Sequence, residues 1–133
     1  MKIFDCFMYF DEETVLDLRL NSLDKYVDYF VIVESKYNHR GQERELLFKM
    51  DKFNKFKDKI IYLIYDEIPK GIQEITSEDN HAHTSWKYIE NALLRENGQR
   101  NFILEGLSLA NDSDYILISD VDEIPNLTKI NFN

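Results

Sequence analysis

The chain has 133 residues, of which 44% are hydrophobic and 31% are charged, with only 4 glycines and 2 prolines. This composition is typical of one folded domain and excludes a disordered chain, so we expect a single domain over residues 1–133. The formal net charge of −9 repels a nucleic-acid backbone, which argues against a nucleic-acid partner. No apolar stretch approaches the roughly 20 residues that span a bilayer, and the first residues lack the pattern of a signal peptide. We therefore expect a cytoplasmic protein.

The first part of the chain predicts two strands joined by a helix. Residues 3–10 are rich in aromatic and apolar side chains, and residues 29–34 form a second, β-branched run that ends in an acid. Between them, leucines and valines recur at spacings near 3.6, which predicts an amphipathic helix over about residues 13–27. The single cysteine, Cys6, has no intrachain partner and is interpreted as a small buried hydrophobe.

The second part continues the alternation of strands and helices. A lysine-rich stretch near residues 48–56 predicts a short helix or two with a solvated face, and residues 59–65 predict a third strand. A polar loop then leads to the longest helical pattern, residues 86–110, with a break expected near residues 97–98. A fourth strand begins at Tyr115. This order favours a parallel, Rossmann-like sheet.

The fourth strand carries the strongest functional signal. Its apolar run, residues 116–118, predicts a strand covered on both faces. Asp120, Asp122 and Glu123 follow directly, at the strand end where open α/β sheets bind ligands. Two aspartates one residue apart can both reach one divalent cation, and oxygen ligands of this kind suit Mg²⁺ or Mn²⁺. Glu34 ends the second strand in a similar position.

Two other acidic sites favour plainer interpretations. Asp66 and Glu67 close the third strand, and for them we favour helix capping or contact with solvent. Asp79 precedes a His-x-His pair, His81 and His83. A structural zinc site needs four ligands, and no cysteine or further histidine is close in sequence, so we favour a solvated loop.

Three blocks of the sequence resemble glycosyltransferase family 17, which includes the β-1,4-mannosyl-glycoprotein N-acetylglucosaminyltransferases. They are residues 3–35, the segment FKDKIIYLIYDEIP, and the closing run GQRNFILEGL followed by DYILISDVDEIPNL. The resemblance covers nearly the whole chain and is weakest in residues 70–85. It implies a GT-A-like fold, an α/β domain with a mostly parallel sheet flanked by helices.

The resemblance also implies roles for particular residues. Asp122 would bind the divalent ion, Mn²⁺ or Mg²⁺, that bridges the pyrophosphate of a UDP-sugar, and Asp120 would contact the ribose or the water shell of the ion. Glu34 would lie near the nucleoside. Arg100 and Asn101 fall in a QRN block of the family, and Arg100 would pair with donor phosphate or sugar. A structural ion pair of Arg100 with a nearby acid is the alternative.

The implied reaction is attack by a hydroxyl of a glycan acceptor on C1 of UDP-GlcNAc, with inversion. The metal would neutralise the departing UDP, and a carboxylate base would take the hydroxyl proton. In this family plan the base and the acceptor pocket follow the Asp-x-Asp motif. Because the sequence stops at Asn133, soon after Asp122, we expect an incomplete domain with the base beyond its end.

Two alternatives stay open at this point. The first is a non-catalytic, truncated remnant that binds nucleotide or associates through an uncovered sheet edge or helix face. The second is a HAD-like phosphohydrolase, which also places Asp-x-Asp after an apolar strand. That second alternative fits less well, because its motif usually opens the fold, whereas here the motif closes the chain and continues into Glu-Ile-Pro.

Overall fold

The computed structural model describes residues 1–132, and its centre is a four-stranded sheet in the order β3-β2-β1-β4. The strands are β1 (Ile3–Tyr9), β2 (Tyr29–Ser35), β3 (Ile60–Tyr65) and β4 (Tyr115–Ile118). Every neighbouring pair is parallel. The predicted α/β, Rossmann-like architecture is therefore confirmed.

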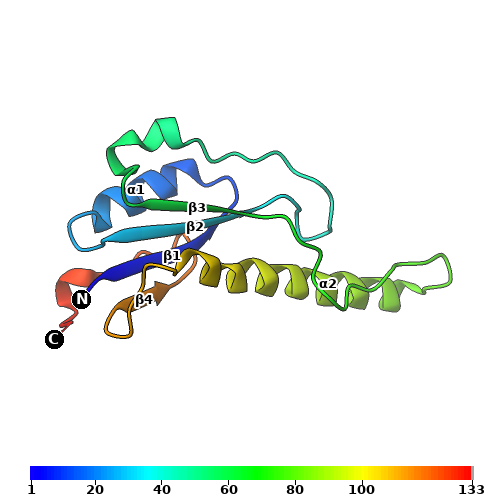
Figure 1. Ribbon diagram of the computed structural model, residues 1–133. Coiled ribbons are helices and arrows are strands. Elements are labelled where there is room, and N and C mark those ends of the chain that lie inside the picture. Colours follow the sequence, from blue (N-terminus) through cyan, green and yellow to red (C-terminus); the bar gives the residue numbers. More distant parts are fainter. Residues whose placement is uncertain (133) are drawn as a thin grey trace.

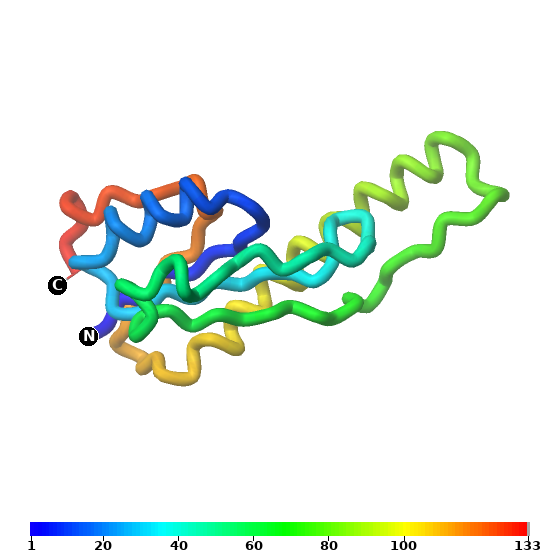
Figure 2. Tube along the Cα trace, turned by 90° about the horizontal axis from the view of Figure 1, so that it is seen from above, coloured from blue at the N-terminus to red at the C-terminus, as the bar shows by residue number. Residues whose placement is uncertain are grey.

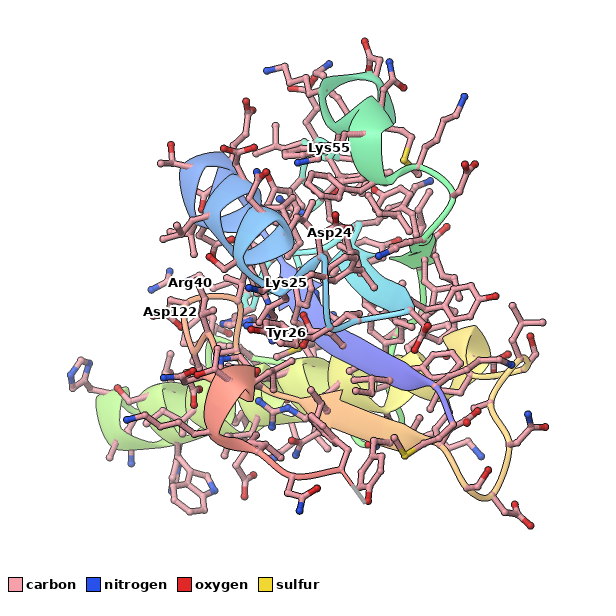
Figure 3. All side chains as sticks on the ribbon, turned by 90° about the vertical axis from the view of Figure 1, so that its left-hand side faces the viewer. Asp24, Lys25, Tyr26, Arg40, Lys55 and Asp122 are labelled. Carbon is pink, nitrogen blue, oxygen red and sulfur yellow. The ribbon has the colours of Figure 1, made fainter. Side chains whose placement is uncertain are left out.

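Helices cover the two faces of this sheet unequally. On one face lie α1 (Glu13–Leu23) and the 3₁₀ helix η1 (Met50–Phe56), and on the other lie α2 (His81–Asn101) and the 3₁₀ helix η2 (Phe102–Gly106) (Figures 1 and 3). A last 3₁₀ turn, η3 (Leu127–Lys129), packs with the closing segment on the α1 face. The crossover from β1 to β2 thus uses one face, and the crossover from β3 to β4 uses the other.

The core follows the alternation of side chains along β1. Ile3 and Phe7 point into the layer beneath α1 and η1, and Phe4 and Cys6 point into the layer beneath η2. Cys6 is fully buried, as predicted, and burial raises the pKa of its thiol to about 12. Such a thiol stays protonated and packs as a small hydrophobe.

The predicted boundaries of two helices are wrong. The first helix ends at Leu23 rather than near residue 27, because the chain turns there: the amides of Tyr26 and Val27 both donate to the Leu23 carbonyl. The long helix begins at His81 rather than Trp86, ends at Asn101 rather than at Ala110, and shows no break at Gly98. Gly98 is needed for space rather than for a bend, since a Cβ at that position would overlap the Tyr65 hydroxyl.

The predicted two-sided burial of the fourth strand is also wrong. β4 is an edge strand that pairs with β1 alone, and Ile116 and Ile118 keep exposed fractions of 37% and 55%. They share the sheet face of Phe4 and Cys6, their partners in register, but α2 and η2 lie over β1, β2 and β3. The apolar run is therefore partly uncovered on one sheet face, and β4 has a free edge. Association through such an uncovered surface stays a prediction.

The first half of α2 extends beyond the sheet together with the segment that precedes it (Figure 2). The two are tied by the Asn91 amide, which exchanges hydrogen bonds with the backbone of Gln73, and by the Lys87–Asp79 ion pair. His81 and His83 lie exposed in the first turn of α2 rather than in a loop, where Asn80 caps the helix. Within residues 1–132, no helix has both the length and the apolar character needed to cross a membrane.

Candidate functional site

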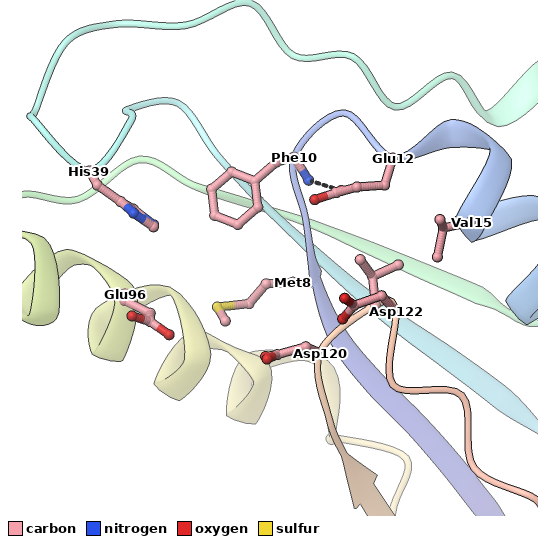
Figure 4. Close-up of a pocket in the computed structure, with 9 residues that line it drawn as sticks. Met8, Phe10, Glu12, Val15, His39, Glu96, Asp120 and Asp122 are labelled. Carbon is pink, nitrogen blue, oxygen red and sulfur yellow. Dashed lines mark hydrogen bonds between the residues drawn. The ribbon is translucent and has the colours of Figure 1, made fainter.

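A cavity of about 370 Å³ opens at the carboxyl edge of the sheet, where β1 and β4 end side by side (Figure 4). Because the crossover from β1 to β2 covers one face and the crossover from β3 to β4 covers the other, the gap between β1 and β4 is the switch point of the sheet. Open α/β sheets bind ligands at such a point. The cavity is lined by residues from the ends of both strands, from the start of α1, from the loop after β2 and from α2: Met8, Phe10, Glu12, Val15, His39, Glu96, Asp120, Val121 and Asp122.

The three acids after β4 form a compact cluster, and two of them, Asp120 and Asp122, line this cavity. Asp120, Asp122 and Glu123 are exposed, and one carboxylate oxygen of each lies within 4.8 Å of the others. Asp120 and Asp122 extend toward the cavity in Figure 4. Oxygen donors grouped in this way suit a hard divalent cation such as Mg²⁺ or Mn²⁺. The donor set therefore fits the ion that the sequence predicts, with Glu123 as a third ligand candidate.

The loop that carries the cluster is held from behind by a buried ion pair. Arg19 of α1 and Asp5 of β1 are both fully buried, and the guanidinium Nη2 lies 2.6 Å from Asp5 Oδ1. The same guanidinium donates to the backbone carbonyls of Asp120, Val121 and Glu123. Neither Arg19 nor Asp5 was singled out from the sequence.

Of the QRN block, one residue reaches the acidic cluster. The Arg100 Nη2 atom lies 3.1 Å from Glu96 Oε1 and 3.6 Å from Asp120 Oδ1, so Arg100 lies between an acid of α2 and an acid of the loop. Asn101 ends α2, is exposed, and makes no capping hydrogen bond to η2. Gln99 is buried and donates to the Val33 carbonyl, which ties α2 to β2.

The structure separates Glu34 from the other predicted ligands. Its side chain is fully buried and does not line the cavity, because four protein groups already use its oxygens. They are the guanidinium of Arg44, the amides of Leu47 and Phe48, and the hydroxyl of Tyr62 at 2.6 Å. The pKa of the Tyr62 hydroxyl is raised, first by burial and second by the hydrogen bond to Glu34. Glu34 thus anchors the segment after β2 against β3.

A second cavity of about 360 Å³ adjoins the first and is lined by Phe10, Asn38, His39, Arg40 and Arg44. It shares Phe10 and His39 with the acidic cavity, and their rings meet edge to face with centroids 5.4 Å apart. The lining of this cavity includes the basic side chains of His39, Arg40 and Arg44, whereas the neighbouring cavity is lined by four acids. Glu34 does not line this second cavity, but it forms an ion pair with Arg44, which does.

Two acids of the first cavity, Glu12 and Glu96, were missed by sequence reasoning. Glu12 accepts hydrogen bonds from the amides of Phe10 and Asp11, so it shapes the turn between β1 and α1. Its place at the cavity could have been predicted, because Glu12 follows the first strand and the carboxyl ends of parallel strands meet at the same edge of the sheet. Glu96 lies within a helix, and nothing in its local sequence indicates which element it faces.

Comparisons with known proteins show which sequences the chain resembles. The family model described as glycosyltransferase family 17 matches residues 1–133. The chain is 27% identical over 118 residues to the β-1,4-mannosyl-glycoprotein 4-β-N-acetylglucosaminyltransferase of Homo sapiens, which covers 86% of this chain and 20% of that protein. The Rattus norvegicus protein of the same name matches to the same extent. The chain therefore spans about a fifth of the length of these curated relatives. No solved structure matches the chain at a significant level.

Proposed function

We propose that this chain, which belongs to glycosyltransferase family 17, binds the UDP-sugar donor of a metal-dependent N-acetylglucosaminyl transfer to a glycan. The observation that carries the proposal is the cluster of Asp120, Asp122 and Glu123 at the switch point of the sheet. Membership of the family removes the phosphohydrolase alternative. The names of the two relatives support N-acetylglucosamine as the transferred sugar.

Charge explains why donor binding would need a cation. Glu12, Glu96, Asp120 and Asp122 all line the first cavity, and a diphosphate that entered it alone would meet four carboxylates. A divalent cation held by Asp122 and Asp120 would offset the charge of these two carboxylates and would offer its remaining coordination positions to phosphate oxygens. The start of α1 faces the same cavity through Glu12 and Val15, and a helix N-terminus favours an anionic group nearby.

The second cavity suits the nucleoside of the donor. Phe10 and His39 offer aromatic surface for a base, and Asn38 and Arg40 offer polar atoms along the rim. Because the two cavities share Phe10 and His39, a nucleoside in one places its phosphates toward the acidic cluster in the other. In this arrangement Glu34 supports the nucleoside site indirectly, through Arg44.

The chemistry assigned to the described residues is binding and orientation of the donor. Bound at the cluster, the cation supplies Lewis-acid stabilisation of the leaving diphosphate. Asp122 and Asp120 hold it, and Arg100, 3.6 Å from Asp120, orients that carboxylate or turns its remaining donors to phosphate. The glycan acceptor and the transfer step itself are proposed for the complete family 17 enzyme.

Titration of UDP into the chain, with Mn²⁺ and with a chelator in its place, tests the proposal. We expect Mn²⁺ to tighten UDP binding by at least about tenfold, because the phosphates meet the acidic cluster only through a cation. Uridine, which has no phosphate, is the matched control, and its affinity should change by less than about twofold. Equal affinity of UDP under both conditions, in folded protein, would reject the metal-dependent site.

The same preparation shows whether the described residues only bind the donor or also activate it. A remnant that binds nucleotide would show Mn²⁺-dependent UDP binding without release of GlcNAc from UDP-GlcNAc. Slow hydrolysis of UDP-GlcNAc to UDP and GlcNAc, measured by chromatography, would indicate that the described residues also activate the donor. Loss of that hydrolysis on chelation would tie the activation to the acidic cluster.

A further inference from the structure

We propose that Arg19 is a positioning residue for the acidic cluster: its guanidinium binds the inner side of the loop after β4 and thereby sets where Asp120, Asp122 and Glu123 present their carboxylates. This inference deepens the proposed function and rests on it for the identity of the ligand. It is independent of the nucleoside and acceptor sites.

The contacts of Arg19 run in two directions from one planar group. Toward β1, Nε and Nη2 donate to the two carboxylate oxygens of Asp5 at 2.8 and 2.6 Å. Toward the loop, Nη1 donates to the carbonyls of Asp120, Val121 and Glu123 at 2.8, 3.2 and 3.1 Å, and Nη2 donates to Ser119 Oγ at 2.7 Å. The guanidinium also stacks over the ring of Phe7, 4.6 Å from its centroid.

The loop wraps around the guanidinium with its carbonyls turned inward. Three carbonyls within four residues accept from the same nitrogen, and the Ser119 hydroxyl closes the turn by donating to the Glu123 carbonyl at 3.1 Å. The side chains of Asp120, Asp122 and Glu123 are left exposed, with their oxygens gathered within 4.8 Å. Carboxylates this close repel one another when no cation is present, so the backbone must be held for the cluster to persist.

Burial of the Asp5–Arg19 pair argues that it serves the loop rather than stability alone. Both side chains are fully buried, and the desolvation cost of such a pair often equals or exceeds its attraction, so apolar residues would serve the core as well. What an apolar residue cannot supply is a rigid fork of donors for a set of backbone carbonyls. Only a guanidinium bonds Asp5 on one side and the loop on the other.

The test compares Arg19→Lys with Leu23→Ala, a matched control from the same helix. Leu23 is 2% exposed in the core, so its truncation lowers stability without removing a hydrogen bond to the loop. Lysine keeps the charge of Arg19 but carries one nitrogen, which cannot reach Asp5 and the loop acceptors together. Two quantities are measured: the affinity for Mn²⁺ alone, from the electron paramagnetic resonance signal of the free ion, and hydrogen exchange of the loop amides.

We expect the Mn²⁺ dissociation constant to rise about tenfold or more in Arg19→Lys, as for loss of an outer-shell partner, and to stay within about twofold in Leu23→Ala. The Glu123 amide, which donates to the Asp120 carbonyl at 2.9 Å, should exchange faster in Arg19→Lys alone. Equal Mn²⁺ affinity in Arg19→Lys and the unmodified chain would overturn the inference. So would equal changes in both variants.

Two further outcomes are distinguishable. If the unmodified chain binds no Mn²⁺, the proposed function fails, and amide exchange alone decides whether Arg19 orders the loop: unchanged exchange in Arg19→Lys overturns the inference. If Arg19→Lys does not fold, Ser119→Ala replaces it, because this change leaves the Asp5 pair intact and removes the Nη2 and Glu123 contacts of the hydroxyl. It should weaken Mn²⁺ binding about threefold, and an unchanged affinity would contradict the inference.

Discussion

Replacement of Asp122 by asparagine is expected to abolish the Mn²⁺-dependent part of UDP binding and to leave the fold intact. Asp122 is exposed and lies at the cavity, so the change removes a charged ligand without disturbing the core. Since loss of an outer-shell partner already lowers metal affinity about 10–100-fold, loss of a direct carboxylate ligand should weaken Mn²⁺ binding by at least about 100-fold and so remove the gain in UDP affinity that Mn²⁺ gives. Calorimetric titration of UDP in the presence of Mn²⁺ measures the effect.

The control for this variant is Asp112→Asn. Asp112 is also exposed, precedes β4, and lies at the opposite end of that strand from the acidic cluster. Both variants change the net charge of −9 by the same amount, so a general effect of charge on UDP would appear in both. Wild-type affinity in Asp122→Asn, or an equal loss in the two variants, would show that the cation binds elsewhere.

Truncation of Glu34 should have the second large effect, on stability rather than on direct ligand contact. Glu34→Ala leaves the Arg44 guanidinium, the Tyr62 hydroxyl and the amides of Leu47 and Phe48 without their acceptor. Removing one partner of a buried, hydrogen-bonded charge costs about 3–5 kcal/mol. We therefore expect the free energy of unfolding in urea to fall by about that amount, and the Tm to fall by roughly 10 °C or more.

Glu45→Ala is the matched variant for this measurement. Glu45 is an exposed acid in the same segment after β2, and its truncation should change the free energy of unfolding by less than about 0.5 kcal/mol. If Glu34→Ala unfolds at the same urea concentration as Glu45→Ala, the anchoring role assigned to Glu34 is wrong. A stable Glu34→Ala protein with lost UDP binding would instead return Glu34 to the ligand site predicted from the sequence.

The acidic cluster was predictable because it depends on two local facts and one general rule. The residues at 116–118 read as a strand, three acids follow it, and carboxyl ends of parallel strands lie on one edge. The same reasoning placed Glu34 in the site, whereas the structure buries it away from the cavity. The groups that use up its oxygens, Arg44 and Tyr62, come from a loop and from another strand, and local sequence does not show which partners meet.

The sequence does contain an indication that Arg19 forms a buried ion pair, but the apolar residues around it make that indication easy to miss. Arg19 stands between Leu16, Leu20 and Leu23, the buried face of α1, and Asp5 stands inside an otherwise apolar strand whose seven residues are all buried. One charge on the apolar face of a helix and one of opposite sign in a buried strand predict a buried pair. That the pair also binds the loop after β4 depends on residues about a hundred positions away, which no local pattern reveals.

The exposure of β4 was not predictable from its composition. A run of three apolar residues is typical of a strand buried on both faces, but burial depends on strand order and on which helices lie above. The order β3-β2-β1-β4 puts this run at an edge. Local sequence determines that a strand forms there, and tertiary packing determines what covers it.

The most direct measurement of the central claim is the anomalous scattering of Mn²⁺ in crystals of the chain soaked with Mn²⁺ and UDP. We predict one anomalous peak roughly 2–2.4 Å from carboxylate oxygens of Asp122 and Asp120, in contact with phosphate oxygens of UDP and in front of the loop that Arg19 holds. A peak at other residues, or bound UDP with no peak at the acidic cluster, would contradict the proposed donor site.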